Sequence, residues 1–227
     1  MLESLTIKYL SGRRLQGLSS DAKPISTQLG TIFDEIDTNK SYLAHKWATW
    51  NTSNESDCVI DSTAGTIITE AGISGEGYAT STNTIKAGQS ITYTDFRNTP
   101  MYKPYGGLAL KASATQSGTA SGERGNYEYY MEWRHTSGNN ALMRFSYNNT
   151  SQADTSNNTI TLDNNDVYKI DIATNGTVSW WKNGVKYYTY SQAANTSTDY
   201  YIAFHGYSDN GTTYGNTGVK IAWEQLT

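Results

Sequence analysis

The sequence predicts an all-β protein, most of which forms a two-sheet antiparallel sandwich. First, residues 167–190 contain three short segments in which apolar and polar residues alternate, as in half-buried strands. Second, Asn-Gly steps at 175–176 and 183–184 separate these segments, and Asn-Gly accepts the positive φ angles of hairpin turns. Third, 18 Tyr and 6 Trp accompany only 3 Pro, and aromatic residues favour pleated strands. Residues 167–190 are therefore predicted to form a three-strand antiparallel meander.

Length and charge limit the classes of partner. The 227 residues suffice for one large β domain with a small appendage. Lys and Arg number 17 against 21 Asp and Glu, a net charge of −4, and nucleic-acid binding needs clustered Lys and Arg, so no nucleic-acid partner is expected. No apolar run reaches the length of a membrane span, and residues 1–17 lack the order of a secretory signal. We therefore expect a soluble protein without membrane insertion. Cys58 is the single cysteine, which excludes an intrachain disulfide.

Residues 1–28 are predicted to be an extended N-terminal arm. Leu5, Ile7 and Tyr9 alternate as in a short strand, and a polar run with Gly and Ser follows as far as Pro24. An isolated strand is marginal in water and leaves its N–H and C=O groups unpaired. Such an arm gains stability against a neighbouring subunit, so we expect a homo-oligomer, a trimer or a ring on a symmetric particle.

Residues 29–50 are predicted to form a small β-hairpin. TIFDEID and SYLAH are its strands, residues 37–40 are its turn, and Trp47 and Trp50 close a small cluster. The expected division of the chain is therefore an arm and Trp-stapled hairpin anchor over residues 1–50, followed by the sandwich domain over residues 51–227.

The hairpin segment resembles a short module of virion and tail-associated proteins from phages and archaeal viruses. The matching positions are Gly30, Ile32-Phe33, Asp37-Thr38, Tyr42-Leu43 and Trp50. The sequence departs from that pattern at His45-Lys46, where the module has a Gly. The resemblance implies that residues 1–50 bind other virion subunits; the alternative is an ordinary β-hairpin held by tryptophan.

The rest of the chain is dense in predicted strands. They are CVID, GQSITYTDF, GGLALKASA, NYEYYMEWRH, NALMRFSYN, TITLD, DYYIAFHGYS and VKIAWEQLT, in addition to the meander. Roughly ten to thirteen strands at this spacing indicate a two-sheet sandwich.

The order of the late strands resembles the concanavalin A-like lectin/glucanase jelly roll, with its laminin-G and SPRY-like branches. The resemblance rests on YKIDI, a V-x-W-x-x-NG hairpin, YYIAF and a final V-x-I-x-W, all within residues 160–227. It implies the jelly-roll fold but no particular function, because that fold carries many roles.

Catalysis is not expected. Laminarin- and agar-cleaving β-jelly-roll hydrolases use a Glu-x-Asp-x-x-Glu strand; Glu35 and Asp37 match it, but Lys40 replaces the third acid. Retaining chemistry needs two carboxyl groups about 5 Å apart, whereas Glu128 and Glu132, on one face of a predicted strand, are about 13 Å apart along it. These acids are interpreted as exposed strand-face residues.

No cofactor or metal is expected either. None of the three histidines has the spacing of a metal ligand pair. Residues 163–166 could offer oxygen ligands to Ca²⁺, but they lack spaced acidic partners.

Aromatic and polar residues of the late strands are the candidate ligand site. Trp181 is predicted on one face of TVSWWK, Tyr188 and Tyr190 share a face of the next strand, and aromatic faces stack on sugar rings. His205 and Asp209 would add polar contacts at a strand end and its turn. The alternative interpretation places these aromatic residues in the core or in a subunit interface.

The resulting hypothesis is a non-enzymatic viral structural protein on the virion or tail surface, which decorates the capsid or attaches to host surface glycans. The alternatives are a secreted or cell-surface carbohydrate-binding lectin module and, third, a glycan-cleaving hydrolase.

Overall fold

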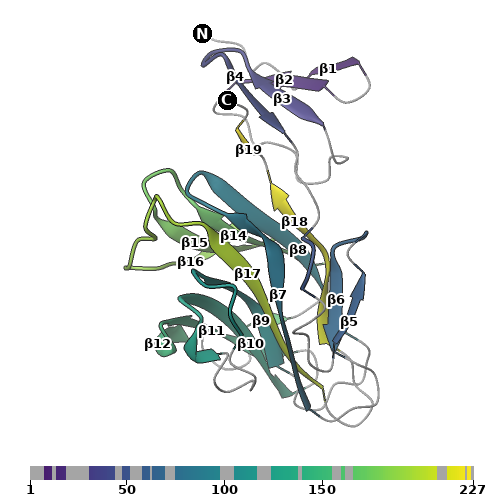
Figure 1. Ribbon diagram of the computed structural model, residues 1–227, viewed down its shortest axis with the longest axis vertical. Helices are drawn as coiled ribbons and strands as arrows, with labels where there is room; N and C mark the ends of the chain where they lie inside the picture. The colour runs from purple at the N-terminus through teal and green to yellow at the C-terminus, as the bar shows by residue number, and fades with distance from the viewer. Residues whose placement is uncertain are drawn as a thin grey trace.

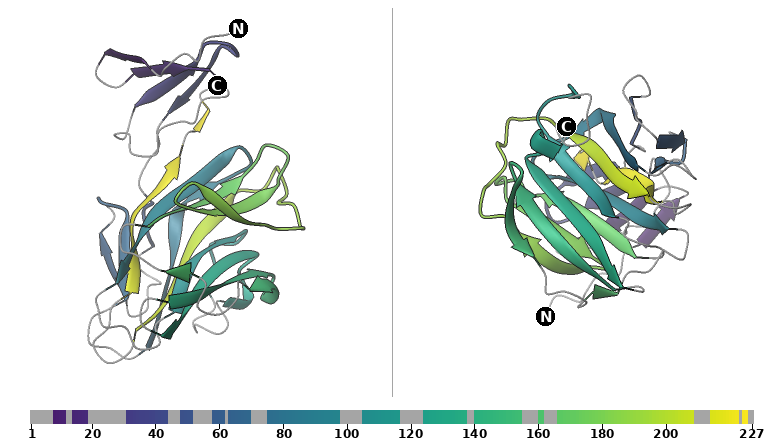
Figure 2. Two further views of the ribbon diagram at one scale, coloured as in Figure 1. Left: turned by 180° about the vertical axis from the view of Figure 1, so that it is seen from behind. Right: turned by 90° about the horizontal axis from the view of Figure 1, so that it is seen from below.

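The computed structural model describes residues 8–11, 14–18, 31–43, 48–51, 58–61, 63–69, 75–97, 105–116, 124–137, 140–154, 160–161, 166–208, 214–222 and 224–225. Their strands form three sheets, which we call the front, back and end sheets. The front and back sheets make up the sandwich, and the end sheet lies beyond one end of it in both side views (Figures 1 and 2).

The front sheet has the strand order β12-β11-β10-β9-β17-β7 in the described part of the chain, with β13 beside β11. Its strands are β7 (Gly75–Ile85), β9 (Tyr105–Lys111), β10 (Tyr129–Ser137), β11 (Asn140–Tyr147), β12 (Thr150–Asp154), β13 (Ile160–Thr161) and β17 (Tyr200–Ser208). The back sheet has the order β16-β15-β14-β8-β18-β6-β5. Its strands are β5 (Cys58–Asp61), β6 (Thr66–Thr69), β8 (Gln89–Arg97), β14 (Val167–Ile172), β15 (Val178–Lys182), β16 (Val185–Thr189) and β18 (Tyr214–Ala222).

The all-β antiparallel sandwich is thus confirmed, and so is the predicted meander. β14 pairs with β15, and β15 with β16, both antiparallel. The turn between β15 and β16 has positive φ at Asn183 (49°) and Gly184 (77°), as the Asn-Gly step predicts. The loop between β14 and β15 is longer and covers residues 173–177. Of its Asn175-Gly176 step only Gly176 has a positive φ (84°), and the Ala173 N–H bonds the Thr177 carbonyl across the loop.

The two sheets bury their facing sides in one core. The front sheet contributes Leu108, Met131 and Phe204, and the back sheet contributes Ile91 and Trp180, each at most 1% exposed. Burial stabilises the fold by about 1.5–3 kcal/mol for each side chain of this kind. The core is therefore the main source of stability of the sandwich.

One long strand has little signal in the sequence. β7 runs over GEGYATSTNTI, which is rich in Gly, Thr and Ser, and our prediction does not include it. It is held by its antiparallel neighbour β17, which lies between β7 and β9. Because both of its faces are covered near its centre, the burial of β7 comes from tertiary contacts and not from its own hydrophobic pattern.

The end sheet contains the described part of the predicted arm. Its order is β1-β2-β3-β4-β19 among the described residues, with β1 (Lys8–Ser11), β2 (Arg14–Gly17), β3 (Ile32–Glu35), β4 (Lys40–Leu43) and β19 (Glu224–Gln225). The predicted hairpin is the pair β3-β4, with positive φ at Asn39 (53°) in its turn.

The arm finds a partner strand within its own chain. β2 lies parallel to β3, with Leu15 opposite Phe33, both fully buried. The Arg14 guanidinium meets the Asp34 carboxylate through Nε–Oδ2 (2.6 Å) and Nη2–Oδ1 (3.0 Å). These contacts satisfy residues 14–17 without a neighbouring subunit, so the predicted oligomer does not follow from them and stays a prediction.

Trp50, predicted to staple the hairpin, lies in the sandwich core together with Ala48. The Ala48 N–H bonds the Val219 carbonyl on β18, and Trp50 forms a bridge with Ser81 on β7. Trp47 is outside the described residues. The packed sandwich therefore includes residues before position 51, and the two-domain division stays a prediction. No helix in the described ranges is long and apolar enough to cross a membrane.

Two turn glycines of the meander allow a matched test of these turns. Both have positive φ, but a Cβ at Gly184 would meet nothing within 4 Å, whereas a Cβ at Gly176 would collide with the Ala194 carbonyl oxygen. A left-handed non-glycine residue costs about 1–2 kcal/mol. We expect Gly184→Ala to lower the free energy of unfolding by that amount and Gly176→Ala to lower it further. Urea unfolding measures both; equal losses would contradict the collision.

Candidate functional site

The outer face of the front sheet, which points away from the sandwich core, carries a second buried cluster. Successive residues of a strand point to opposite faces. On β17, Phe204 enters the core while Ala203 joins Ala109, Tyr127 and Tyr130 in a separate cluster. In a sandwich this face would otherwise meet solvent, so its burial needs an explanation beyond core packing.

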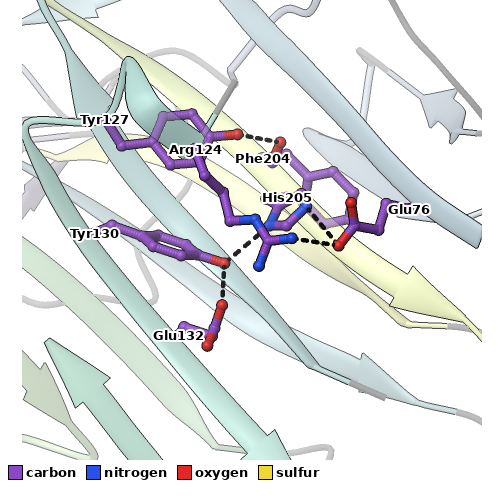
Figure 3. A network of polar contacts seen from close by, with 7 residues as sticks. All are labelled: Glu76, Arg124, Tyr127, Tyr130, Glu132, Phe204 and His205. Atoms are coloured by element: carbon purple, nitrogen blue, oxygen red, sulfur yellow. Dashed lines mark hydrogen bonds and ion pairs between the residues drawn. The ribbon is translucent and has the colours of Figure 1, made fainter. Parts of the chain in front are cut away.

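A hydrogen-bonded network lies on this face (Figure 3). The Tyr130 hydroxyl is 3.1 Å from His205 Nδ1 and donates to Glu132 Oε2 at 3.2 Å. The strand register gives the Tyr130 ring room, because its cross-strand neighbours are Ala109 and, one strand further, Ala203. Tyr130 thus joins the histidine to a carboxylate.

The network continues from His205 toward the edge of the sheet. His205 Nε2 lies 3.9 Å from Glu76 Oε1 on β7, and Arg124 Nη2 pairs with the same oxygen at 2.6 Å. The Glu76 and Arg124 side chains keep 21% and 26% of their surface exposed, while His205 has none. The network therefore runs from a fully buried histidine to charged groups that reach solvent (Figure 3).

Described residues between β9 and β10 lie against this face. The buried Lys111 Nζ donates to the Thr115 carbonyl at 3.0 Å, and Gln116 Nε2 donates to Thr80 Oγ1 at 3.1 Å. Closer to β10 in the chain, the Tyr127 ring lies 5.1 Å from Tyr130 between centroids. Gln116 and Tyr127 thus contact the outer face beside the network.

Burial of these groups is costly unless they are paired. Glu132 is 1% exposed and His205 0%, and removing a carboxylate from water carries a large penalty. The core does not require them, since they lie on the opposite face. Clusters of ionisable groups that carry this cost without a packing role are candidates for a functional site.

The structure separates the residues predicted as the ligand site. His205 is in the network, whereas Tyr190 is in the core, 5% exposed, with its hydroxyl donating to the Tyr130 carbonyl at 2.8 Å. Tyr188 packs on the core and stacks on Phe145 with centroids 4.5 Å apart. Trp181 lies on the outer side of the back sheet, opposite Lys169 and Lys186. Asp209 lies outside the described residues.

A bulge explains the position of the two tyrosines. Trp180 is opposite Tyr188 but Trp181 is opposite Lys186, so the register shifts at Tyr187. Because Trp180 points into the core, its partner Tyr188 points there too, and Tyr190 follows two residues later. The core interpretation, which the sequence analysis leaves open, describes Tyr188 and Tyr190.

Sequence reasoning missed the partners of His205. Tyr130 and Glu132 alternate with the core residues Tyr129, Met131 and Trp133 in YYMEW, a signal that separates two faces of one strand. Glu132 is interpreted from the sequence as an exposed acid, but it is buried. The sequence does not show that other residues lie over this face of the strand. Glu76 and Arg124 carry no signal, since they approach His205 only through the fold.

The two glutamates of this region do not act as a pair on one face. Glu132 bonds Tyr130 on the outer face. Glu128 precedes β10, and its carboxylate accepts hydrogen bonds from the Ala112 backbone N–H and the hydroxyl of Tyr200, a core residue. In the ranges that the structure describes, no group of three or more His, Cys, Asp or Glu side chains is placed to hold a metal ion.

Three solved structures with a similar fold are lectin domains. The carbohydrate recognition domain of Emp46p, in its potassium-bound form, has a TM-score of 0.52 and 8% identity over 75% of this chain and 88% of its own. The legume lectin-like domain from Entamoeba histolytica has 0.51 and 10% over 77% and 91%. The lectin from Bauhinia forficata in complex with GalNAc has 0.52 and 9% over 82% and 100%. No family model and no curated protein matches the sequence. The expected lectin-type jelly-roll fold is confirmed.

Glu128 gives the stability of this region a defined pH dependence. Burial raises the pKa of its carboxyl above the usual value, although the two hydrogen bonds oppose this. The folded state thus binds the proton more tightly than the unfolded chain, so the group stabilises the fold at low pH, and this contribution is lost as pH rises through the raised pKa. We expect Glu128→Gln to gain stability relative to the natural protein between about pH 4 and about pH 7.

The matched control is Asp61→Asn. Hydrogen bonds from Thr63 lower the pKa of Asp61, so its stabilisation is present above the unfolded pKa and disappears as pH falls. Relative to the natural protein, this variant should lose stability as pH rises from about 2 to about 4, because the lowered pKa of Asp61 acts below the usual carboxyl value. Thermal melts from about pH 2 to about pH 7 measure both variants, and a gain of stability with rising pH in the Asp61 variant would contradict the assignment.

Proposed function

We propose that this chain is a non-enzymatic carbohydrate-binding module that holds its ligand at the outer face of the front sheet. The observation that carries the proposal is the buried network of Tyr130, Glu132 and His205, which ends in the partly exposed pair Glu76–Arg124. These groups lie on the face of the front sheet that points away from the core.

The chemistry of these groups suits a polyhydroxylated ligand. Carboxylate oxygens accept hydrogen bonds from sugar hydroxyls, a guanidinium donates several in a fixed geometry, and aromatic rings pack on C–H faces. Glu76 and Arg124 reach solvent and would meet the ligand first. Tyr130 and Glu132 would act behind them, holding His205 in one orientation.

The comparisons support this class of function. The lectin from Bauhinia forficata was solved with GalNAc, and Emp46p contributes a domain named for carbohydrate recognition. They give no support to a virion or tail location, which stays a prediction, as do contacts of residues 1–50 with other virion subunits. A secreted or cell-surface lectin module is therefore the favoured setting.

A glycan array probed with the full chain tests the proposal. Binding to at least one neutral glycan is expected, and Arg124→Ala and Glu76→Gln should each weaken it by about tenfold or more, the effect of losing a hydrogen bond to a charged group. Arg14→Ala is the matched control, because it removes an Arg–carboxylate pair in the end sheet. Unchanged binding in both front-sheet variants, or an equal loss in the Arg14 variant, would contradict this location.

Absence of catalysis is tested separately. Incubation with common β-glucans and cell-wall polysaccharides should release no new reducing ends, because Glu128 and Glu132 bond different partners, Tyr200 and Tyr130, whereas retaining chemistry needs two carboxyl groups about 5 Å apart. Turnover that disappears in Glu132→Gln or Glu128→Gln would show that the chain is a glycan-cleaving enzyme.

A further inference from the structure

The outer face of the back sheet carries a cross-strand row of lysines that the front-sheet site does not involve. Strand pairing places Lys220 on β18 opposite Thr92 on β8, Thr92 opposite Lys169 on β14, Lys169 opposite Trp181 on β15, and Trp181 opposite Lys186 on β16. Across these five neighbouring strands, β18, β14 and β16 each contribute a lysine. We call these five residues the lysine row.

Strand alternation sends the row away from the core. Ile91 and Tyr93 flank Thr92, and both are core residues. Val219 and Ile221, also in the core, flank Lys220 in the same way. The row thus lies on the outside of the back sheet, and strands about 4.8 Å apart space its lysines about 10 Å from one another.

Trp181 adds an apolar plane between two of the lysines. Lys169 Nζ lies 4.7 Å and Lys186 Nζ 5.4 Å from the centroid of its ring. An indole attracts cations to its face, so the ring holds both ammonium groups beside it. Asp171, on the same face of β14, pairs with Lys169 at 3.3 Å.

Hydroxyl groups run beside the lysine row. In the neighbouring cross-strand row, Ser90 is opposite Asp171, Asp171 opposite Ser179, and Ser179 opposite Thr189. The Ser179 and Thr189 hydroxyls are 3.3 Å apart. Ser90 and Ser179 are buried (9% and 5% exposed), so Thr189 is the exposed hydroxyl of this neighbouring row.

We propose that the lysine row is a second binding surface, for a linear acidic polysaccharide that crosses the strands. Carboxylates of its sugar units would pair with Lys186, Lys169 and Lys220, and a sugar ring would pack on Trp181. The chain has a net charge of −4, so the molecule as a whole does not attract anions. Binding of an acidic ligand would therefore depend on these lysines. Burial lowers the pKa of Lys220, and an anion beside it would favour its charged form.

The test titrates the full chain with an oligogalacturonate and with its methyl-esterified, uncharged counterpart. The natural protein should bind only the charged form, and added salt should weaken binding because exposed ion pairs are screened. Lys169→Gln and Lys186→Gln should each weaken it by up to about fivefold, and Trp181→Leu by about two- to tenfold. Lys86→Gln, which removes an exposed lysine between β7 and β8, should change nothing.

Each other outcome overturns the proposal. These outcomes are equal binding of the uncharged oligomer, an equal effect of Lys86→Gln, or unchanged binding in both lysine variants with an unchanged melting temperature. If duplex DNA binds as tightly as the oligogalacturonate, the row is a general polyanion surface. Arg124→Ala should leave this binding intact, so failure here is distinguishable from failure of the front-sheet site.

Discussion

The front sheet must bury both of its faces, and the rest of the molecule is arranged around that requirement. Strand pleating sends Phe204 into the sandwich core and His205 to the opposite side, yet both are fully buried. The inner side is satisfied by the back sheet. The outer side is buried by Gln116, Tyr127 and a network of polar side chains among the described residues. Burial of the inner face by the back sheet stabilises the sandwich, and burial of the outer face creates the candidate site.

Local sequence patterns are sufficient to predict the β14–β16 meander. The alternation in β14 and the Asn183-Gly184 step specify the meander because their information lies within a few residues. The position of Tyr188 was not predictable, since it depends on a one-residue bulge in the pairing of β15 with β16. The setting of His205 was less so: Tyr130 is 75 residues away along the chain, and Arg124 and His205 both contact Glu76, which comes from a third strand. Polar β7 gives no pattern at all, because neighbouring strands supply its burial.

The end sheet shows a similar limit. Its hairpin β3-β4 follows from its own residues, but the parallel pairing of β2 with β3 and the addition of β19 next to β4 join distant segments. The Leu15–Phe33 contact gives residues 14–17 a partner that the composition of the arm does not reveal. Virion association is predicted from a segment that includes β3 and β4, and their pairing in the end sheet leaves it a prediction.

The positions of β17 and β18 have a consequence for biosynthesis. β17 lies between β9 and β7 in the front sheet, and β18 lies between β8 and β6 in the back sheet, although both come from residues 200–222. A nascent chain on the ribosome that has not passed residue 200 lacks an interior strand of each sheet, so neither sheet can close around its long-range pairs. Closure of both sheets therefore requires residues 200–222, and until these residues are available, unpaired strand edges are open to chaperones or to aggregation.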